Sequence, residues 1–210
     1  MEFVVSAVRV KICGLTRNRD VLAAVKGGAD ALGFVFASRS KRVLDAGRAA
    51  ELVSNMPAFV CRVGLFMDQD SETVESVLRH VPLSLLQFHG SESAEFCRRF
   101  GLPYMKAVSM ETDRAVRQAE DDYGDAAALL LDSHPAGGVG GTGKVFDWAM
   151  IPSIRIPLVL AGGLEPANVG KAVRQVRPWG VDVSSGVEDA PGIKNEKLMC
   201  EFIKEAKREY

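Results

Sequence analysis

Eight short apolar runs alternate with longer amphipathic stretches along the whole of this 210-residue chain. The runs lie at residues 7–13, 31–36, 59–66, 83–88, 104–107, 127–131, 158–161 and 180–183. They are rich in Val, Ile, Leu and Phe, and this near-continuous apolar character is typical of parallel strands covered on both faces. We therefore predict eight buried parallel strands.

Seven of the intervening stretches have the composition of helices, with Ala, Glu, Arg and Leu in quantity. They lie at 19–26, 46–55, 72–79, 93–100, 113–121, 166–175 and 196–207. Expected N-terminal caps are Asn18, Asp70 or Ser71, Ser91, Thr112 and Asn195, since such side chains bind free amide groups at helix starts. Pro166 stands where a first helical turn would begin.

Alternating strands and helices predict parallel βαβ units, arranged either as a closed barrel or as an open doubly wound sheet. Eight units fill the chain, so we expect a (β/α)8 TIM barrel, compact beside the typical length of about 250 residues. The interval 146–151 is too short for a full helix and predicts a shortened crossover after strand six. Without a linker-like segment, residues 1–210 are expected to form a single domain.

Charge and cysteine spacing exclude several classes of function. The 26 basic and 27 acidic residues give a net charge of −1, so nothing favours a nucleic-acid or membrane partner. The four cysteines are far apart, which argues against a zinc site, and we expect no metal. The first ten residues lack a basic region leading into an apolar run, so the expected location is the cytoplasm.

Polar residues at the C-terminal ends of the strands are the candidates for chemistry, because barrel active sites lie there. Lys11 and Cys13 end strand one and share a face, and Cys13 is a candidate base or nucleophile. A cysteine packed as a small hydrophobe is the alternative. Asp132 ends strand six, where a carboxylate is costly unless paired or functional; a turn-capping aspartate is the alternative. His89 ends strand four and is expected to face the site, or to make a structural hydrogen bond.

Small residues follow strands six, seven and eight. Five glycines lie within 137–143, and Gly162, Gly163, Ser184, Ser185 and Gly186 follow strands seven and eight. Glycine backbone approaches a ligand closely, and barrels commonly build a phosphate site from these loops. Their joint placement predicts a site for a small phosphorylated substrate.

Taken in order, these motifs resemble those of the phosphoribosylanthranilate isomerase family. The matching segments are 11–16, 87–90, 140–148, 161–164 and 180–188. The opening KICG and the closing DVSSGVE are together specific, and the matches span essentially the whole chain.

The resemblance implies a cofactor-free Amadori rearrangement in tryptophan biosynthesis, in which N-(5-phosphoribosyl)anthranilate is converted from an aminoaldose to an aminoketose. It implies Cys13 as general base and Asp132 as general acid. It also implies an arginine after strand two that binds the anthranilate carboxylate. That arginine is Arg42 in this chain, where Lys41 replaces a family proline, and Arg39 is the alternative.

The remaining expected site residues bind the substrate. Substrate binding is expected at His89 and Asp182, where Asp182 either holds Lys11 or touches the substrate. Phosphate binding is expected at Gly141, Gly143, Gly162, Gly163, Ser184, Ser185 and Gly186. No metal and no cofactor are expected, and the chain is expected to be a monomer or a homodimer.

Physical chemistry supports an acid and a base in these positions. An apolar setting favours a protonated carboxylic acid, and Leu129 to Leu131 lead directly into Asp132. A thiol acts as a base when cations lower its pKa from about 8.5, and Lys11 and the iminium of the substrate are expected to do so.

Two rival functions remain open at this point. The related sugar-phosphate isomerase of histidine biosynthesis catalyses the same type of reaction but uses aspartates in both roles, and Cys13 disfavours it. A non-catalytic barrel that senses a phosphorylated metabolite would bind its ligand without turnover.

Overall fold

Eight parallel strands close into a barrel in sequence order, and β8 pairs with β1 to complete it. The computed structural model describes residues 7–110, 112–132 and 147–208. The strands are β1 (Arg9–Cys13), β2 (Ala31–Val35), β3 (Cys61–Phe66), β4 (Leu85–Phe88), β5 (Tyr104–Ser109), β6 (Ala128–Asp132), β7 (Leu158–Leu160) and β8 (Gly180–Val183). The closed barrel is confirmed, and the open-sheet alternative is wrong.

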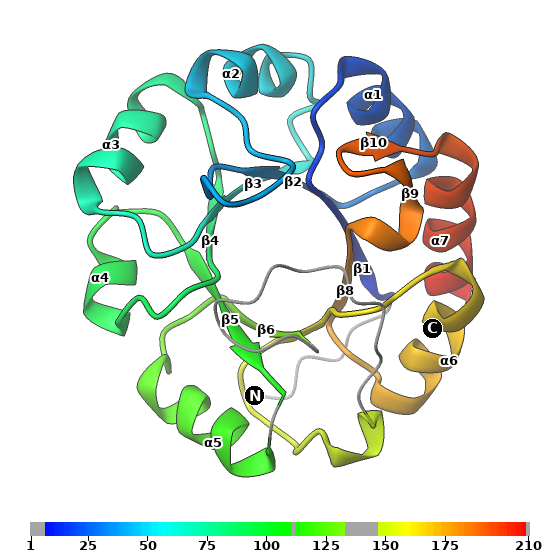
Figure 1. The fold of residues 1–210 in the computed structure, drawn as a ribbon. Helices are drawn as coiled ribbons and strands as arrows, with labels where there is room; N and C mark the ends of the chain where they lie inside the picture. Colours follow the sequence, from blue (N-terminus) through cyan, green and yellow to red (C-terminus); the bar gives the residue numbers. More distant parts are fainter. Residues whose placement is uncertain (1–6, 111, 133–146, 209–210) are drawn as a thin grey trace.

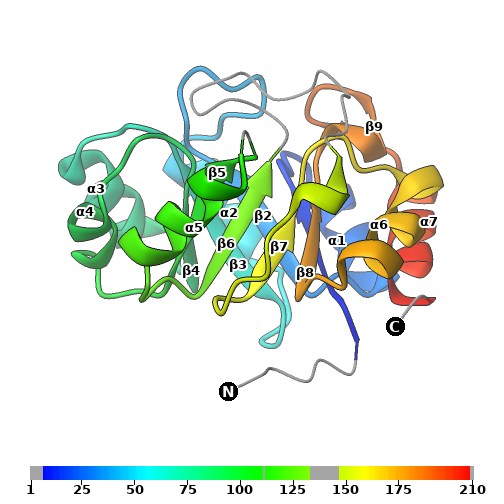
Figure 2. The same ribbon diagram turned by 90° about the horizontal axis from the view of Figure 1, so that it is seen from below.

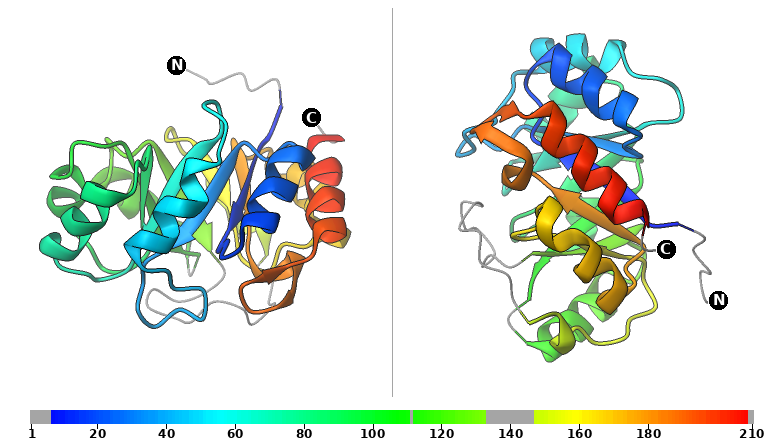
Figure 3. Two further views of the ribbon diagram at one scale, coloured as in Figure 1. Left: turned by 90° about the horizontal axis from the view of Figure 1, so that it is seen from above. Right: turned by 90° about the vertical axis from the view of Figure 1, so that its right-hand side faces the viewer.

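The helices form a ring around the barrel (Figure 1). They are α1 (Asn18–Gly27), α2 (Ala46–Ser54), α3 (Ser71–His80), α4 (Ala94–Arg98), α5 (Asp113–Asp122), α6 (Pro166–Val176) and α7 (Glu196–Arg208). The last helix, α7, lies beside both α1 and α6, so the ring closes on itself (Figure 3). No helix in the described part of the chain is both long enough and apolar enough to cross a membrane.

The capping predictions are partly confirmed. The side chains of Asp70 and Thr112 accept hydrogen bonds at the starts of α3 and α5, and Asn195 accepts one from the amide of Leu198. Two predictions are wrong. Arg17 precedes α1, so Asn18 is already helical, and Ser93 rather than Ser91 caps α4. At α1 the helix begins at Asn18 itself, after Arg17, whose side chain makes no capping hydrogen bond. At α4, Ser91 and Ser93 are both cap-forming residues two positions apart, and the second one caps the helix.

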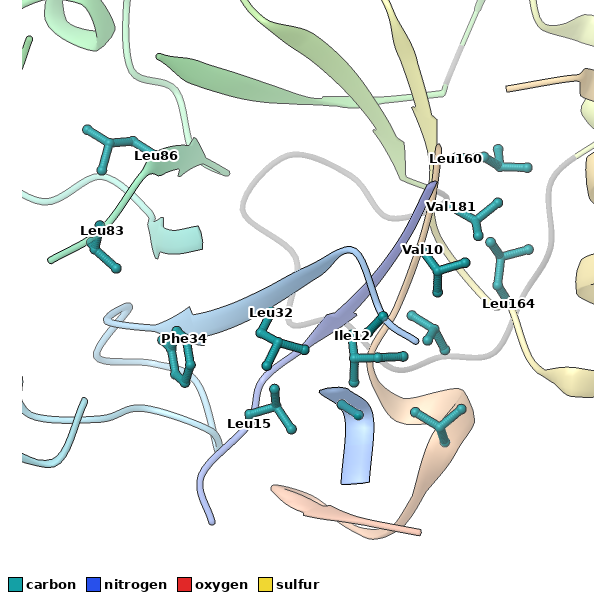
Figure 4. Packing of buried hydrophobic residues seen from close by; sticks show 14 of the residues in the cluster. Val10, Ile12, Leu15, Leu32, Phe34, Leu83, Leu86, Leu160, Leu164 and Val181 are labelled. Atoms are coloured by element: carbon teal, nitrogen blue, oxygen red, sulfur yellow. The ribbon is translucent and has the colours of Figure 1, made fainter. Parts of the chain in front are cut away.

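Strand side chains alternate between a layer under the helices and the inside of the barrel. On β1, Val10 and Ile12 face outward and are fully buried in the large outer cluster with Leu32 and Phe34 (Figure 4). A separate inner cluster consists of Met105, Ala107, Ala128, Leu130, Val159 and Ala161. This alternation directs Lys11 and Cys13 to the inside.

Two segments differ from regular βα units. The described part of the crossover after β6 contains a short 3-10 helix, η1 (Trp148–Met150); its remainder lies outside the described residues, so the shortened crossover stays a prediction. After β8, a 3-10 turn, η2 (Ser185–Val187), leads into a hairpin of β9 (Glu188–Ala190) and β10 (Ile193–Lys194). This hairpin was not predicted from the sequence; it lies beyond the C-terminal end of β8 (Figure 2).

Candidate active site

Cys13 ends β1 and is buried on the inner face of the barrel. Lys11, one layer below it, pairs with Asp182 at 2.8 Å between Nζ and Oδ1. The two residues are direct partners in the β1–β8 register, so the strand pairing itself brings them together. Of the two alternatives for Asp182, the structure therefore places it on Lys11. We call Lys11, Cys13, Asp182 and Lys194 the base side.

Burial and neighbouring charges have opposite effects on the pKa values of Lys11 and Cys13. Burial disfavours the charged form of Lys11, but Asp182 and Cys13 outweigh it and hold the pKa of Lys11 above its usual value. Burial raises the pKa of the Cys13 thiol, and Lys11 and Lys194 only partly offset this. Lys11 therefore acts on the pKa of the Cys13 thiol in the expected direction, but the effect of desolvation, which the sequence did not indicate, is larger.

Lys194 is a second cation near the thiol. Its side chain is 0% exposed, and Nζ donates to the carbonyl oxygen of Ser184 at 2.9 Å and pairs with Glu188 at 2.8 Å. The Ser184 hydroxyl in turn donates to the carbonyl oxygen of Cys13 at 3.1 Å. The β9–β10 hairpin thus supports the end of β1.

Asp132 ends β6 on the far side of the barrel mouth, with its side chain 16% exposed. His89 Nε2 lies 3.6 Å from Asp132 Oδ2, and His89 Nδ1 lies 3.0 Å from Gln87 Nε2. Burial lowers the pKa of His89 despite the nearby carboxylates, so the imidazole is neutral at neutral pH. We call Gln87, His89 and Asp132 the acid side.

His89 connects the two sides electrostatically, because Asp132, Asp182 and Lys11 all act on its imidazole. Cys13 in turn is influenced by Lys11 and Asp182. Asp132 shares a strand face with Leu130 of the inner cluster, and Cys13 shares one with Lys11, so the candidate acid and base both lie on the inner face of the barrel at the C-terminal ends of β6 and β1. Among the described residues, no three His, Cys, Asp or Glu side chains are grouped as metal ligands would be.

Arg42 reaches the base side from the loop after β2. Its side chain lies against Gly14, where an added methyl group would collide with Arg42 Cδ. The guanidinium binds Glu188 through two hydrogen bonds, at 2.8 Å from Nε and 2.6 Å from Nη2. Arg39, the alternative, is exposed. Arg42 is therefore the arginine that lies beside Cys13.

The loops after β7 and β8 pack against each other. Gly162 and Gly163 adopt φ values of 81° and 65°, which favour glycine. At Gly186 a side chain would collide with the carbonyl oxygen of Leu164, so glycine is required for the two loops to meet. Ser185 begins η2. Gly141 and Gly143 lie outside the described residues.

Three residues of the site were not predicted from the sequence. Glu188 and Lys194 belong to the hairpin after β8, and Gln87 is fully buried inside the barrel. Gln87 stands two positions before His89, so the alternation of strand faces was a signal for it. Lys194 follows no strand of the barrel and carried no such signal.

A closed parallel barrel with titratable side chains gathered at the C-terminal strand ends defines the class of (β/α)8-barrel enzymes. Residues 10–205 match the family described as N-(5'phosphoribosyl)anthranilate (PRA) isomerase. The N-(5'-phosphoribosyl)anthranilate isomerase of Thiobacillus denitrificans is 52% identical over 203 residues, covering 96% of this chain and 98% of that protein.

Solved structures of the same family are also similar to this chain. The phosphoribosyl anthranilate isomerase of Thermotoga maritima is 40% identical, covers 95% of this chain and 98% of its own, and superposes with a TM-score of 0.85. A phosphoribosyl anthranilate isomerase in complex with reduced 1-(o-carboxyphenylamino)-1-deoxyribulose 5-phosphate is 39% identical over 95% of this chain and 98% of its own, with a TM-score of 0.81. This chain belongs to the N-(5'-phosphoribosyl)anthranilate isomerase family. It is an isomerase of the aldose–ketose type, an intramolecular oxidoreductase.

Proposed function

We propose that this protein converts N-(5'-phosphoribosyl)anthranilate into 1-(o-carboxyphenylamino)-1-deoxyribulose 5-phosphate, with Cys13 as general base and Asp132 as general acid. The observation that carries the proposal is the convergence of these two side chains on one barrel mouth. A relative that binds the reduced form of this product supports the choice of substrate. The step belongs to tryptophan biosynthesis.

Asp132 acts first. Its carboxylic acid donates a proton to the ring oxygen of the ribose while the anthranilate nitrogen donates its electron pair to C1, and the C1–O bond breaks. The product of this step is an open-chain protonated Schiff base. The neutral imidazole of His89, 3.6 Å from the carboxyl, orients Asp132 without adding a full positive charge that would favour the carboxylate.

Cys13 acts second. Its thiolate removes the proton from C2, and the electron pair of the C2–H bond neutralises the iminium to give an enolamine, which tautomerises to the ketone. Burial raises the pKa of the Cys13 thiol, and the cationic iminium of the substrate supplies part of the positive charge that favours the thiolate. Lys11 and Lys194 supply the remainder.

Arg42 and the loops after β7 and β8 hold the two ends of the substrate. The guanidinium of Arg42 binds the anthranilate carboxylate, and backbone groups of Gly162, Gly163 and the segment 184–186 bind the phosphate. The packing of Gly186 against Leu164 supports a shared phosphate site, since it brings both loops to one place. His89 and Asp182 line the space between, and Gly141 and Gly143 remain predicted phosphate ligands.

A continuous fluorescence assay tests this function. We expect purified protein to consume phosphoribosylanthranilate, with loss of the anthranilate fluorescence and formation of the aminoketose. Binding of the substrate without consumption would instead indicate the non-catalytic sensor and would contradict the proposal.

Residues 1–210 form one domain, the protein works in the cytoplasm, and neither metal nor cofactor takes part. The Thermotoga maritima relative is dimeric, and for this chain both a monomer and a homodimer are compatible with the site.

A further inference from the structure

Glu188 is the most heavily contacted carboxylate near the base side, yet the mechanism above gives it no role. Its side chain is 4% exposed. Oε1 accepts hydrogen bonds from Arg42 Nε and Lys194 Nζ, both at 2.8 Å, and from the amide of Gly192 at 3.2 Å. Oε2 accepts from Arg42 Nη2 at 2.6 Å. A carboxylate with this many donors is fixed in position.

Lys194 anchors Glu188 independently of Arg42. Its ammonium group is completely buried and also donates to the carbonyl oxygen of Ser184, so the lysine cannot follow a moving carboxylate. The Arg42 side chain is 15% exposed and extends from the loop after β2 across Gly14. Glu188 is therefore the rigid partner of this pair, and its position sets that of the guanidinium.

The way Glu188 binds Arg42 leaves one edge of the guanidinium for another anion. The guanidinium has five N–H donors. Among the described residues, its hydrogen bonds use Nε and one hydrogen of Nη2. The edge formed by Nη1 and the second Nη2 hydrogen has the spacing that a second carboxylate needs for a two-point contact.

The charge of the cluster also fits such a ligand. Two cations, Arg42 and Lys194, share the single negative charge of Glu188, so the cluster carries an excess of one positive charge. One carboxylate on a ligand neutralises that excess.

We propose that Glu188 is a positioning residue that holds Arg42 with its outer edge toward the substrate and so determines the preference for an arylamine bearing an ortho carboxylate. This role rests on the proposed function, because it assigns the carboxylate of that substrate to Arg42. Glu188 does not touch the reacting atoms, and it acts on recognition rather than on the chemical step.

Steady-state kinetics with two substrates test the role. One is N-(5-phosphoribosyl)anthranilate, and the other is N-(5-phosphoribosyl)aniline, which lacks the carboxylate. We expect Glu188→Gln to lower kcat/KM for the first by about tenfold to a hundredfold, chiefly through KM, because a charge-assisted contact is lost. For the aniline compound we expect a change of no more than about twofold.

A double-mutant cycle with Arg42→Met separates positioning from a general structural effect. If Glu188 acts through Arg42, then adding Glu188→Gln to Arg42→Met leaves the preference between the two substrates unchanged. Asp189→Asn is the matched control, since Asp189 is an exposed carboxylate on the same hairpin that contacts Asn195 and not Arg42, and it should alter neither KM.

Several outcomes would overturn the role. If Glu188→Gln lowered kcat/KM equally for both substrates, Glu188 would have only a structural role. If it lowered KM for the anthranilate compound, Glu188 would compete with the substrate carboxylate for Arg42. If Glu188→Gln does not fold by circular dichroism, Glu188→Asp keeps the charge and shortens the reach, and the same selective rise in KM is required. Wild-type protein that turns over neither compound would overturn the proposed function itself.

Discussion

The base side and the acid side of the barrel mouth differ in charge and in exposure to solvent. On the base side, Lys11 and Asp182 form a buried 2.8 Å ion pair, and Lys194 adds a second cation. On the acid side, Asp132 faces a neutral imidazole at 3.6 Å, and its own side chain is 16% exposed. Cys13 and Asp132, which must exchange protons with the same sugar, therefore have different electrostatic surroundings.

This difference fits the separate tasks of an acid and a base. A buried thiol needs positive charge nearby before it becomes a thiolate, and two lysines provide part of it. A carboxyl that must carry a proton is better served by a neutral neighbour than by a cation. Paired groups with opposed surroundings are a general way of assigning acid and base roles at one pH.

The largest expected effect comes from removing either group. Cys13→Ser and Asp132→Asn should each lower turnover by at least about 10²–10⁴-fold, since each removes one general acid–base contribution, while both variants still bind the product analogue. Substrate deuterated at C2 distinguishes the two variants. Compared with the unaltered protein, the isotope effect on kcat should be larger in Cys13→Ser, because removal of the C2 proton becomes rate-limiting. It should be smaller in Asp132→Asn, because ring opening becomes rate-limiting. Near-normal turnover in one variant would remove that residue from the mechanism.

The second effect is the pH dependence of the unaltered protein. Because the pKa of the Cys13 thiol lies above that of a free thiol, only a small fraction is thiolate at neutral pH. Over the pH range in which Asp132 keeps its proton, we expect kcat/KM to rise with pH by up to about tenfold per unit until the thiol is ionised, and to fall where the carboxyl loses its proton. In Asp132→Asn, whose side chain does not titrate, a profile of residual activity that is flat from neutral pH upward would show that the thiol is already ionised, or is not the base.

The third effect tests the cations of the base side. Lys11→Met removes a positive charge and leaves Asp182, which opposes ionisation of Cys13, without its lysine. The thiol should therefore titrate at higher pH, and kcat/KM at neutral pH should fall on the order of tenfold or more. Ultraviolet absorbance of the thiolate follows the titration, with Cys13→Ser as the blank and the exposed Lys26→Met as the matched control. An unchanged titration would leave Lys11 no such role.

The smallest effect concerns stability on the acid side. The folded protein lowers the pKa of His89, whereas the unfolded chain restores it to about 6.5. As the pH falls through about 6.5, the unfolded state gains a proton that the folded state does not, so this group costs stability, by at most about 1.4 kcal/mol per pH unit. Urea unfolding of His89→Gln should show a smaller loss on acidification than the unaltered protein. The exposed His80→Gln should behave like the unaltered protein.

Strand periodicity and the count of eight units predicted the barrel and placed Cys13 and Asp132 at the ends of strands one and six, and the family resemblance supplied their expected roles. Apolar runs define parallel strands, and the last polar residues of strands one and six are Cys13 and Asp132. The pairing of Lys11 with Asp182 depends on the register between the first and last strands, which follows only from closure of the barrel. The sequence therefore left both alternatives for Asp182 open.

The desolvation of Cys13 and the β9–β10 hairpin could not be predicted from this one sequence. The sequence showed that Lys11 could favour the thiolate of Cys13. The desolvation of Cys13, however, depends on how completely the barrel interior is filled. Lys194 lies in a segment without strand periodicity, and its burial results from packing against Ser184 and Glu188. Both features arise from tertiary structure rather than from local sequence.

A structure of this protein with reduced 1-(o-carboxyphenylamino)-1-deoxyribulose 5-phosphate tests the central claim most directly. We expect the sulfur of Cys13 beside C2 of the sugar and the carboxyl of Asp132 beside the oxygen that closed the ribose ring, both within about 3.5 Å. Either group pointing away from the sugar, or the two contacting different parts of the ligand, would contradict it.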